Sequence, residues 1–252
     1  MKLLNNQKEF TKALELFDKY KKNNTQSLST LTITQALKAC AQTGDLQRGS
    51  TIHQFLSSRF EKNSAILTSL IHFYSYIKNN MPNKAIDLFN QIQNPDKVIL
   101  ILFFNACAQL ETHEALNLIK NVSSKLQKPS YSDLNLLTSL IDALMKCGDV
   151  IHAQSLFDNS TKKTLFMYGA MMKGYIKNNM PNKAIDLFNE IKNPDEVIIS
   201  LLFDACAELK TSKALHLVKN VLSKLPKSSY SNLYLLTSLI DALMKCGDVK
   251  YA

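Results

Sequence analysis

Residues 139–149 of this 252-residue chain are Ser-Leu-Ile-Asp-Ala-Leu-Met-Lys-Cys-Gly-Asp, and the same residues return at 238–248. The similarity extends further, because 77–150 and 176–249 share 56 of 74 positions at an offset of 99 residues. Apolar residues recur every three to four positions through 134–146, which is the period of an amphipathic helix. Gly148 suits the left-handed residue that ends a helix, and Asp149 suits the N-cap of a following helix. The stretch therefore predicts a helical hairpin.

The hairpin pattern recurs every 31 to 37 residues, a spacing typical of helical solenoids. It predicts six repeats, at 30–63, 64–96, 97–133, 134–164, 165–195 and 196–232. Residues 1–29 would hold the second half of a truncated repeat, and 233–252 the first half of another. Helix is the only recurring element, so the predicted fold class is all-α, an α-solenoid superhelix of stacked helix-turn-helix repeats in one continuous array. Both ends fall partway through a repeat, which indicates a fragment of a longer protein.

The charge balance favours a polyanionic partner. Thirty Lys plus Arg against 21 Asp plus Glu give a net charge of +9, as expected of a nucleic-acid binder, although a solvated lysine-rich surface is the alternative. Only Arg48 and Arg59 are arginines, so lysine point charges facing phosphates would be the main electrostatic device. No apolar run approaches the roughly 18 residues of a membrane span, and no membrane partner is expected.

Catalytic signatures are missing from the sequence. The five histidines have no partner at metal or catalytic spacing, and neither a Gly-rich phosphate loop nor a G-x-S-x-G motif occurs. The five cysteines form no C-x-x-C pair and fit buried, reduced thiols. We therefore expect no enzymatic activity, cofactor, metal or small-molecule substrate in this chain.

Three kinds of repeat can be distinguished, and together they resemble the pentatricopeptide repeat (PPR) family over essentially the whole chain. The motif at 139–149 resembles the short type; 168–175 with 183–188 and Pro194-Asp195, the standard type; and 37–41 with 44–46 and 52–53, the long type. Long, short and standard repeats of 37, 31 and 31 residues explain the 99-residue period as one PLS-type triplet. The tetratricopeptide alternative expects a Trp in its first helix, and this chain has none.

The resemblance implies sequence-selective binding of single-stranded RNA, about one base per repeat, in RNA processing, editing or stabilisation. It implies that one base-reading residue, the helix reader, lies on the first helix, and that the other, the loop reader, is the last residue of the repeat. The implied pairs are Thr34 with Asn63, Thr68 with Asp96, Ile101 with Asp133, Thr138 with Thr164, Gly169 with Asp195, and Ser200 with Asn232, while Thr237 is a helix reader whose partner lies beyond the chain end.

The resemblance also suggests which bases are read. Thr or Ser with Asn resembles an adenine reader, and Thr with Asp a guanine reader, because Asp only accepts hydrogen bonds whereas Asn also donates them. Adenine is thus expected at the first and sixth repeats and guanine at the second. Ile101, Gly169 and the pair of Thr138 with Thr164 depart from the familiar combinations. For each helix reader, an ordinary exposed helical residue is the alternative.

Two further sets of residues are carried over from the family. Three residues before each helix reader is a stacking position that would wedge an apolar side chain against bases, occupied by Leu31, Ala65, Val98, Asn135, Phe166, Val197 and Tyr234. Phe166 and Tyr234 are the best of these, with packing inside the fold as the alternative. Lys146, Lys177 and Lys245 match a phosphate-facing position, with complementation of the helix dipole as the alternative.

The two copies of the triplet differ at 18 of 74 positions. The differences include the helix reader and loop reader of the long repeat, and the stacking position after it: Ile101/Ser200, Asp133/Asn232 and Asn135/Tyr234. We therefore hypothesise that the copies kept their packing and diverged in what they bind.

Other functions remain open from the sequence. A protein-interaction scaffold of tetratricopeptide-like architecture is one, and the targeting arm of an enzyme whose catalytic domain lies outside the fragment is another. In the second case a catalytic RNA-processing or editing partner is expected. The family implies a mitochondrial or chloroplast location, and mitochondrial is the analogy adopted. Residues 1–22 do not resemble a targeting peptide, being acidic in part and free of arginine, and without one the location would be cytoplasmic.

Overall fold

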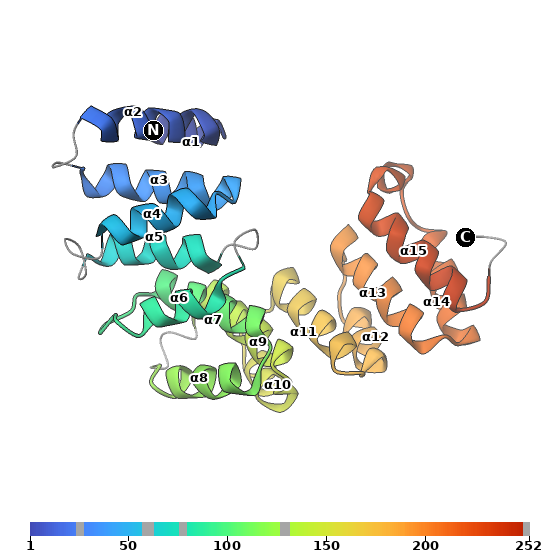
Figure 1. The fold of residues 1–252 in the computed structure, drawn as a ribbon. Coiled ribbons are helices and arrows are strands. Elements are labelled where there is room, and N and C mark those ends of the chain that lie inside the picture. The colour runs from blue at the N-terminus through green and yellow to red at the C-terminus, as the bar shows by residue number, and fades with distance from the viewer. Residues whose placement is uncertain (24–27, 57–62, 76–79, 127–131, 249–252) are drawn as a thin grey trace. The chain divides into compact units, whose positions relative to one another are not determined.

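The computed structural model describes residues 1–23, 28–56, 63–75, 80–126 and 132–248, and the regular structure in these ranges is entirely helical (Figure 1). The helices are α1 (Lys2–Asn6), α2 (Phe10–Asn23), α3 (Thr30–Thr43), α4 (Leu46–Leu56), α5 (Ser64–Ser75), α6 (Pro82–Phe89), α7 (Lys97–Leu110), α8 (His113–Ser124), α9 (Leu134–Lys146), α10 (Val150–Asp158), α11 (Leu165–Lys177), α12 (Pro181–Asn189), α13 (Glu196–Leu209), α14 (Ser212–Leu222), the 3-10 helix η2 (Lys227–Ser231) and α15 (Leu233–Lys245). The predicted all-α fold class is confirmed. Residues 1–29 carry the short helix α1 ahead of the second helix expected there.

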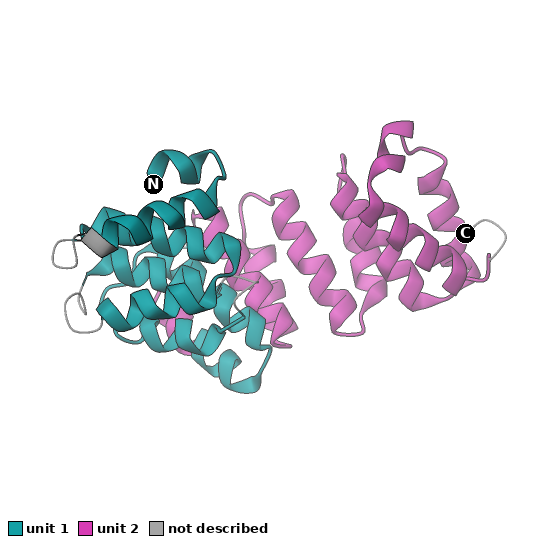
Figure 2. Cartoon of the chain, turned by 45° about the horizontal axis from the view of Figure 1, so that its top comes forward, with its two compact units in different colours: residues 1–119 teal, residues 120–252 magenta. Residues whose placement is uncertain are grey.

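The chain divides into two compact units, residues 1–119 and 120–252, which are coloured separately in Figure 2. In each unit the first helices of successive repeats pack side by side: α3, α5 and α7 in one, and α9, α11, α13 and α15 in the other. The second helices α4, α6, α10, α12 and α14 each pack on the first helix of their own repeat. Each unit is therefore a stack of helical hairpins. Within the described ranges, no helix is long and apolar enough to cross a lipid bilayer.

The first helices supply most of the apolar core. Side chains with no exposed surface lie at equivalent places along them: Leu37, Ile71 and Phe104 in the first unit, and Ile141, Met172 and Phe203 in the second. Burying one such side chain contributes about 1.5–3 kcal/mol. Successive repeats are also joined through aromatic contacts, such as Phe89 of α6 stacked on Phe103 of α7 with ring centroids 4.1 Å apart. Stability is thus built from contacts between neighbouring repeats, as in other solenoids.

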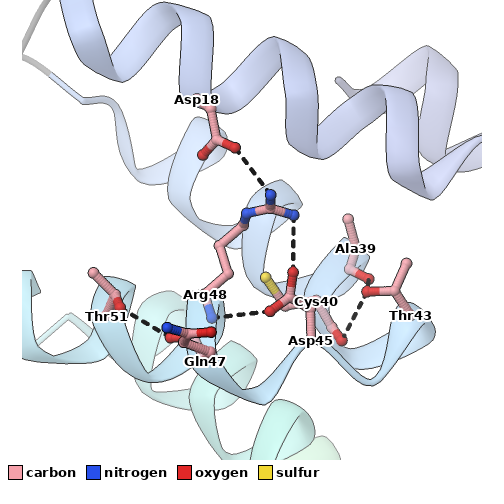
Figure 3. A network of polar contacts seen from close by, with 8 residues as sticks. All are labelled: Asp18, Ala39, Cys40, Thr43, Asp45, Gln47, Arg48 and Thr51. Carbon is pink, nitrogen blue, oxygen red and sulfur yellow. Dashed lines mark hydrogen bonds and ion pairs between the residues drawn. The ribbon is translucent and has the colours of Figure 1, made fainter.

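A Gly-Asp corner follows the first helix of three repeats. Its glycines are left-handed, with φ of 73° at Gly44, 88° at Gly148 and 95° at Gly247, a region that L side chains disfavour. An aspartate follows each glycine. In the first of these corners Arg48 joins α4 to α2, because its guanidinium lies 2.9 Å from Asp45 and 3.1 Å from Asp18 (Figure 3).

The other two corners use lysine for the same connection. Lys120 of α8 lies 2.7 Å from Asp149, and Lys219 of α14 forms an ion pair with Asp248. Asp149 also accepts hydrogen bonds from the backbone N–H of His152 at 3.2 Å and from its ring at 2.7 Å. Burial alone would raise the pKa of Asp149, but the bonds from Lys120 and His152 outweigh it, so the pKa lies below its ordinary value. Asp149 is therefore both an N-cap and the link to the preceding repeat.

We expect Asp149→Ala to lower the free energy of unfolding by about 2 kcal/mol, because it removes a helix cap and leaves Lys120 unpaired. Since the folded pKa of Asp149 is depressed, its contribution is present above about pH 4 and is lost as the pH falls through the folded value. Urea denaturation at neutral and acidic pH measures this. Asp186→Ala, at an exposed position of α12, is the control. A loss at neutral pH no larger than that of the control would contradict the assignment.

Candidate nucleic-acid interface

The six loop readers predicted from the sequence lie where one repeat ends and the next first helix begins, and each accepts a hydrogen bond from the start of that helix. They are Asn63, Asp96, Asp133, Thr164, Asp195 and Asn232. The Asp96 carboxylate, for example, accepts from the Ile99 N–H at 2.9 Å, and the Asn232 amide oxygen accepts from the Tyr234 N–H at 3.1 Å. One acceptor atom of each loop reader is thus used as an N-cap, which fixes the direction of the rest of the side chain.

The five helix readers that carry a hydroxyl group lie one turn into their helices. Each of them makes the same kind of hydrogen bond within its helix. Each donates to a backbone carbonyl three or four residues earlier: Thr34 to Leu31, Thr68 to Ser64, Thr138 to Leu134, Ser200 to Glu196, and Thr237 to Leu233. Donor–acceptor distances run from 2.5 Å at Thr138 to 3.0 Å at Thr34. With the hydroxyl proton committed to the helix, the oxygen can offer only acceptor capacity to a ligand.

Exposure differs among the helix readers. Thr237 is exposed, whereas Thr34, Thr68 and Thr138 are half-buried. Ser200 is only 1% exposed, so its hydroxyl does not reach solvent in this structure. Any recognition by the sixth repeat therefore depends on Asn232.

Two helix readers lack a hydrogen-bonding side chain. Ile101 is half-buried on α7, and Gly169 is half-buried on α11. A Cβ built at Gly169 would lie 3.6 Å from Ile198 Cδ1 and 3.9 Å from Leu201 Cδ1, which is ordinary van der Waals contact. The backbone around Gly169 thus has room for a Cβ atom.

In two repeats, a hydrogen bond joins the first residue of the repeat to its loop reader. The Asn232 amide donates to the Glu196 carboxylate at 2.6 Å, and Glu196 also accepts the Ser200 hydroxyl bond through its backbone. In the first repeat the Asn63 amide donates to the Thr30 hydroxyl at 3.4 Å. The hydrogen bonds from Asn232 first, and then from Ser229, lower the pKa of Glu196 and keep it ionised. No local sequence pattern indicates these partners, because they lie 36 and 33 residues apart.

The stacking positions form the second element of each site, at the second residue of each first helix. Their side chains are all exposed, the larger ones by 82% at Phe166, 61% at Tyr234, 59% at Leu31 and Val197, and 48% at Val98, while Ala65 and Asn135 are the smaller ones. Packing inside the fold, the alternative interpretation of Phe166 and Tyr234, does not occur. Exposed apolar side chains thus recur beside the capping loop readers.

The three predicted phosphate-facing lysines lie in the last turns of their helices. Lys146 is 2.7 Å from Asp142 and Lys245 is 2.9 Å from Asp241, each an i,i+4 pair, and Lys177 is exposed. The hydrogen bond to Asp241 raises the pKa of Lys245, which therefore stays charged. The carboxylates hold two of these ammonium groups at a defined place on the helix, and the i,i+4 spacing is a signal that the sequence contained. Among the described residues, no group of three His, Cys, Asp or Glu side chains could hold a metal ion.

Comparison with known proteins shows which proteins this chain is similar to. The family model described as PPR repeat matches residues 73–94, 136–163 and 166–193. The pentatricopeptide repeat-containing protein At1g03540 of Arabidopsis thaliana is 25% identical over 97% of this chain and 45% of its own length, and At2g03380, a mitochondrial protein of the same plant, is 30% identical over 62% of this chain and 23% of its own length. The chloroplastic relative At1g08070 is 26% identical over 70% of this chain and 29% of its own length. The chain spans less than half the length of each of these relatives.

Solved structures show the same fold. The crystal structure of the pentatricopeptide repeat protein PPR10 from maize superimposes with a TM-score of 0.70 at 18% identity, over 92% of this chain and 34% of that one. PPR10 in complex with an 18-nt psaJ RNA element gives a TM-score of 0.66 over 92% of this chain and 35% of that one, also at 18% identity. Residues 73–94, 136–163 and 166–193 therefore match PPR repeats, and the chain shares the α-solenoid fold of PPR10.

Proposed function

We propose that this chain binds single-stranded RNA, about one base per repeat, and so takes part in RNA processing, editing or stabilisation. One observation carries the proposal: each first helix begins with a capping polar residue, then an exposed stacking position, and carries the helix reader one turn later. An exposed aromatic or aliphatic side chain offers a face to a base, and fixed polar groups offer hydrogen bonds to its edge. The net charge of +9 favours the phosphate backbone.

The hydrogen bonds that the helix readers and loop readers make within the protein supply a chemical reason for base preference. A threonine whose proton is donated to the helix presents an acceptor, and an aspartate with one oxygen used as a cap presents a second acceptor through the other. Two acceptors match guanine, which carries neighbouring donors at N1 and N2 of its Watson–Crick edge. Thr68 with Asp96 therefore fits guanine.

An asparagine loop reader leads to the opposite preference. Its oxygen caps the helix and one amide hydrogen is donated within the repeat, so the second amide hydrogen is the donor that remains for a base. An acceptor plus a donor matches the edge of adenine or cytosine, which supports adenine for Thr34 with Asn63. At the sixth repeat only Asn232 is available, because Ser200 is buried. Its amide donor matches the ring-nitrogen acceptor of adenine, which remains the proposed base, and cytosine carries the same kind of acceptor. The hydroxyl of Thr164, which accepts from Met167 N–H at 3.2 Å, likewise leaves a donor beside Thr138.

The wider role follows from the family. We propose that the repeats follow the PLS pattern, that catalysis, where a transcript is edited or cut, comes from a partner or from another part of a longer protein, and that the protein works in mitochondria. Relatives named as mitochondrial and as chloroplastic both support an organelle.

Filter binding of the whole 252-residue chain to poly(A), poly(C) and poly(U) RNA tests RNA binding. We expect measurable affinity that falls steeply between about 50 and 200 mM salt, because lysines release counterions from phosphates. An RNA duplex of equal length is the control and should bind more weakly, since its bases cannot reach the stacking positions. Affinity that is absent, or insensitive to salt, would reject the proposal.

Gly169→Thr should create a guanine reader in the fifth repeat, since Asp195 already caps the next helix there. The threonine would repeat the arrangement of Thr68 with Asp96, and a Cβ fits at this position. We expect preference for guanine opposite this repeat to rise about tenfold, measured by competition between RNAs that differ at one base. Gly169→Val, with the same shape but no hydroxyl, is the matched control. Equal base preference in the two variants would contradict hydrogen-bond recognition by the helix reader.

A further inference from the structure

The first residue of a repeat reaches the loop reader that ends the same repeat. Glu196 begins α13 and accepts a hydrogen bond of 2.6 Å from the amide of Asn232, 36 residues later. Thr30 begins α3 and accepts a hydrogen bond of 3.4 Å from the amide of Asn63, 33 residues later. Both partners of asparagine are acceptors, so the contact is the same in two separate repeats.

The sequence changes both members of this contact together. In the first copy of the long repeat, Lys97 stands where the second copy has Glu196, and Asp133 stands where it has Asn232. In the first copy the anionic loop reader thus occurs with a cationic first residue, and in the second copy the amide loop reader occurs with an anionic first residue. Neither copy places a carboxylate at both positions. The fourth and fifth repeats begin with Leu134 and Leu165, whose side chains cannot hydrogen-bond. The repeats therefore differ in whether the first residue can hold the loop reader.

We propose that the first residue of each repeat is a third specificity-determining position, which sets the hydrogen-bonding group that the loop reader presents to a base. This inference rests on the proposed RNA binding. The first residue does not contact the base itself; it is a positioning residue that acts through the loop reader.

The chemistry at Asn232 shows how Glu196 would act. The amide oxygen is taken by the Tyr234 and Leu235 N–H groups at 3.1 and 3.3 Å, and one amide hydrogen is taken by Glu196. Only the second amide hydrogen is left for a base, so the residue presents a single, directed donor. The nearby carboxylate also repels O6 of guanine and O4 of uracil, which stand where adenine and cytosine carry an amino group. Glu196 should therefore sharpen discrimination in favour of adenine and cytosine.

A double-mutant cycle without RNA tests the coupling. Asn232→Asp alone places two carboxylates at hydrogen-bonding distance and should lower the melting temperature by about 2–4 °C. Adding Glu196→Lys recreates the residue pair of the first copy, and the double variant should regain most of that loss. Glu190→Lys in the Asn232→Asp background is the control for net charge, because Glu190 is exposed at the end of α12. Equal recovery with the control would overturn the coupling.

RNA selection tests the effect on recognition. We expect Glu196→Leu, the residue type of the fourth and fifth repeats, to reduce discrimination against guanine and uracil opposite the sixth repeat about threefold to tenfold, as for one lost hydrogen bond. Preferences opposite other repeats, and those of a Glu190→Leu control, should stay unchanged. Unaltered base preference in a variant that still binds RNA would overturn this inference alone. Failure of the unaltered chain to bind RNA would overturn the proposed function, and this inference with it.

Discussion

Gly174→Ala is expected to lower the free energy of unfolding by about 3 kcal/mol, at the upper end for an overpacked core. Gly174 lies on α11, where a Cβ would come within 2.4 Å of Met145 Cβ on α9. Because Met145 has no exposed surface and its Cβ is fixed to the backbone, the contact cannot be relieved by rotating a side chain. The helices would have to separate, and the stack of first helices in the second unit would be weakened.

A second glycine of the same helix is a control for this effect. Gly169→Ala has its nearest contact, Ile198 Cδ1, at 3.6 Å, and alanine favours the helix over glycine by about 1 kcal/mol. It should therefore be neutral or stabilising. Urea denaturation of the two variants measures the difference, and similar stability of both would contradict the close packing of α9 on α11.

Replacing both Phe166 and Tyr234 with alanine should weaken RNA binding about 100-fold, since stacking on an aromatic side chain contributes about 1–3 kcal/mol per base. The two side chains are 82% and 61% exposed, so little packing is lost and the melting temperature should change by no more than about 2 °C. Filter binding and thermal unfolding of the same preparations separate the two effects.

Ile151→Ala is the matched control, because Ile151 is also 82% exposed but lies on α10, a second helix. It should leave RNA affinity unchanged. An equal loss of affinity in this control, or a large loss of stability in the aromatic double variant, would show that Phe166 and Tyr234 are not a binding surface.

The fold could be predicted because it depends on short-range features of the sequence. Apolar spacing over 134–146, a Gly-Asp corner at 148–149 and recurrence of the motif are each short-range features, so the all-α solenoid could be predicted. Packing between repeats could not. Ser200 is buried although it occupies the same position as the exposed Thr237, because exposure depends on neighbouring helices rather than on the helix itself.

The candidate site was accessible from the sequence only in part. The residues came from the family resemblance, and their assignment to RNA stays a prediction, whereas the structure adds their bonding state. Asp96 and Asn232 each use one acceptor as a helix cap, which depends on side-chain direction. Glu196 accepts a hydrogen bond from Asn232, which is a contact between residues far apart in the sequence. For Phe166, the sequence left open whether the side chain is packed or exposed, and the structure shows that it is exposed.

Selection from a pool of randomised single-stranded RNA tests base-by-base recognition most directly. The predicted result is an enriched sequence in which an adenine, opposite Thr34 and Asn63, directly neighbours a guanine, opposite Thr68 and Asp96. A second adenine, or a cytosine, should stand opposite the sixth repeat, with three bases between it and the guanine. Enrichment of no sequence, or of one without the neighbouring adenine and guanine, would contradict recognition by these residues.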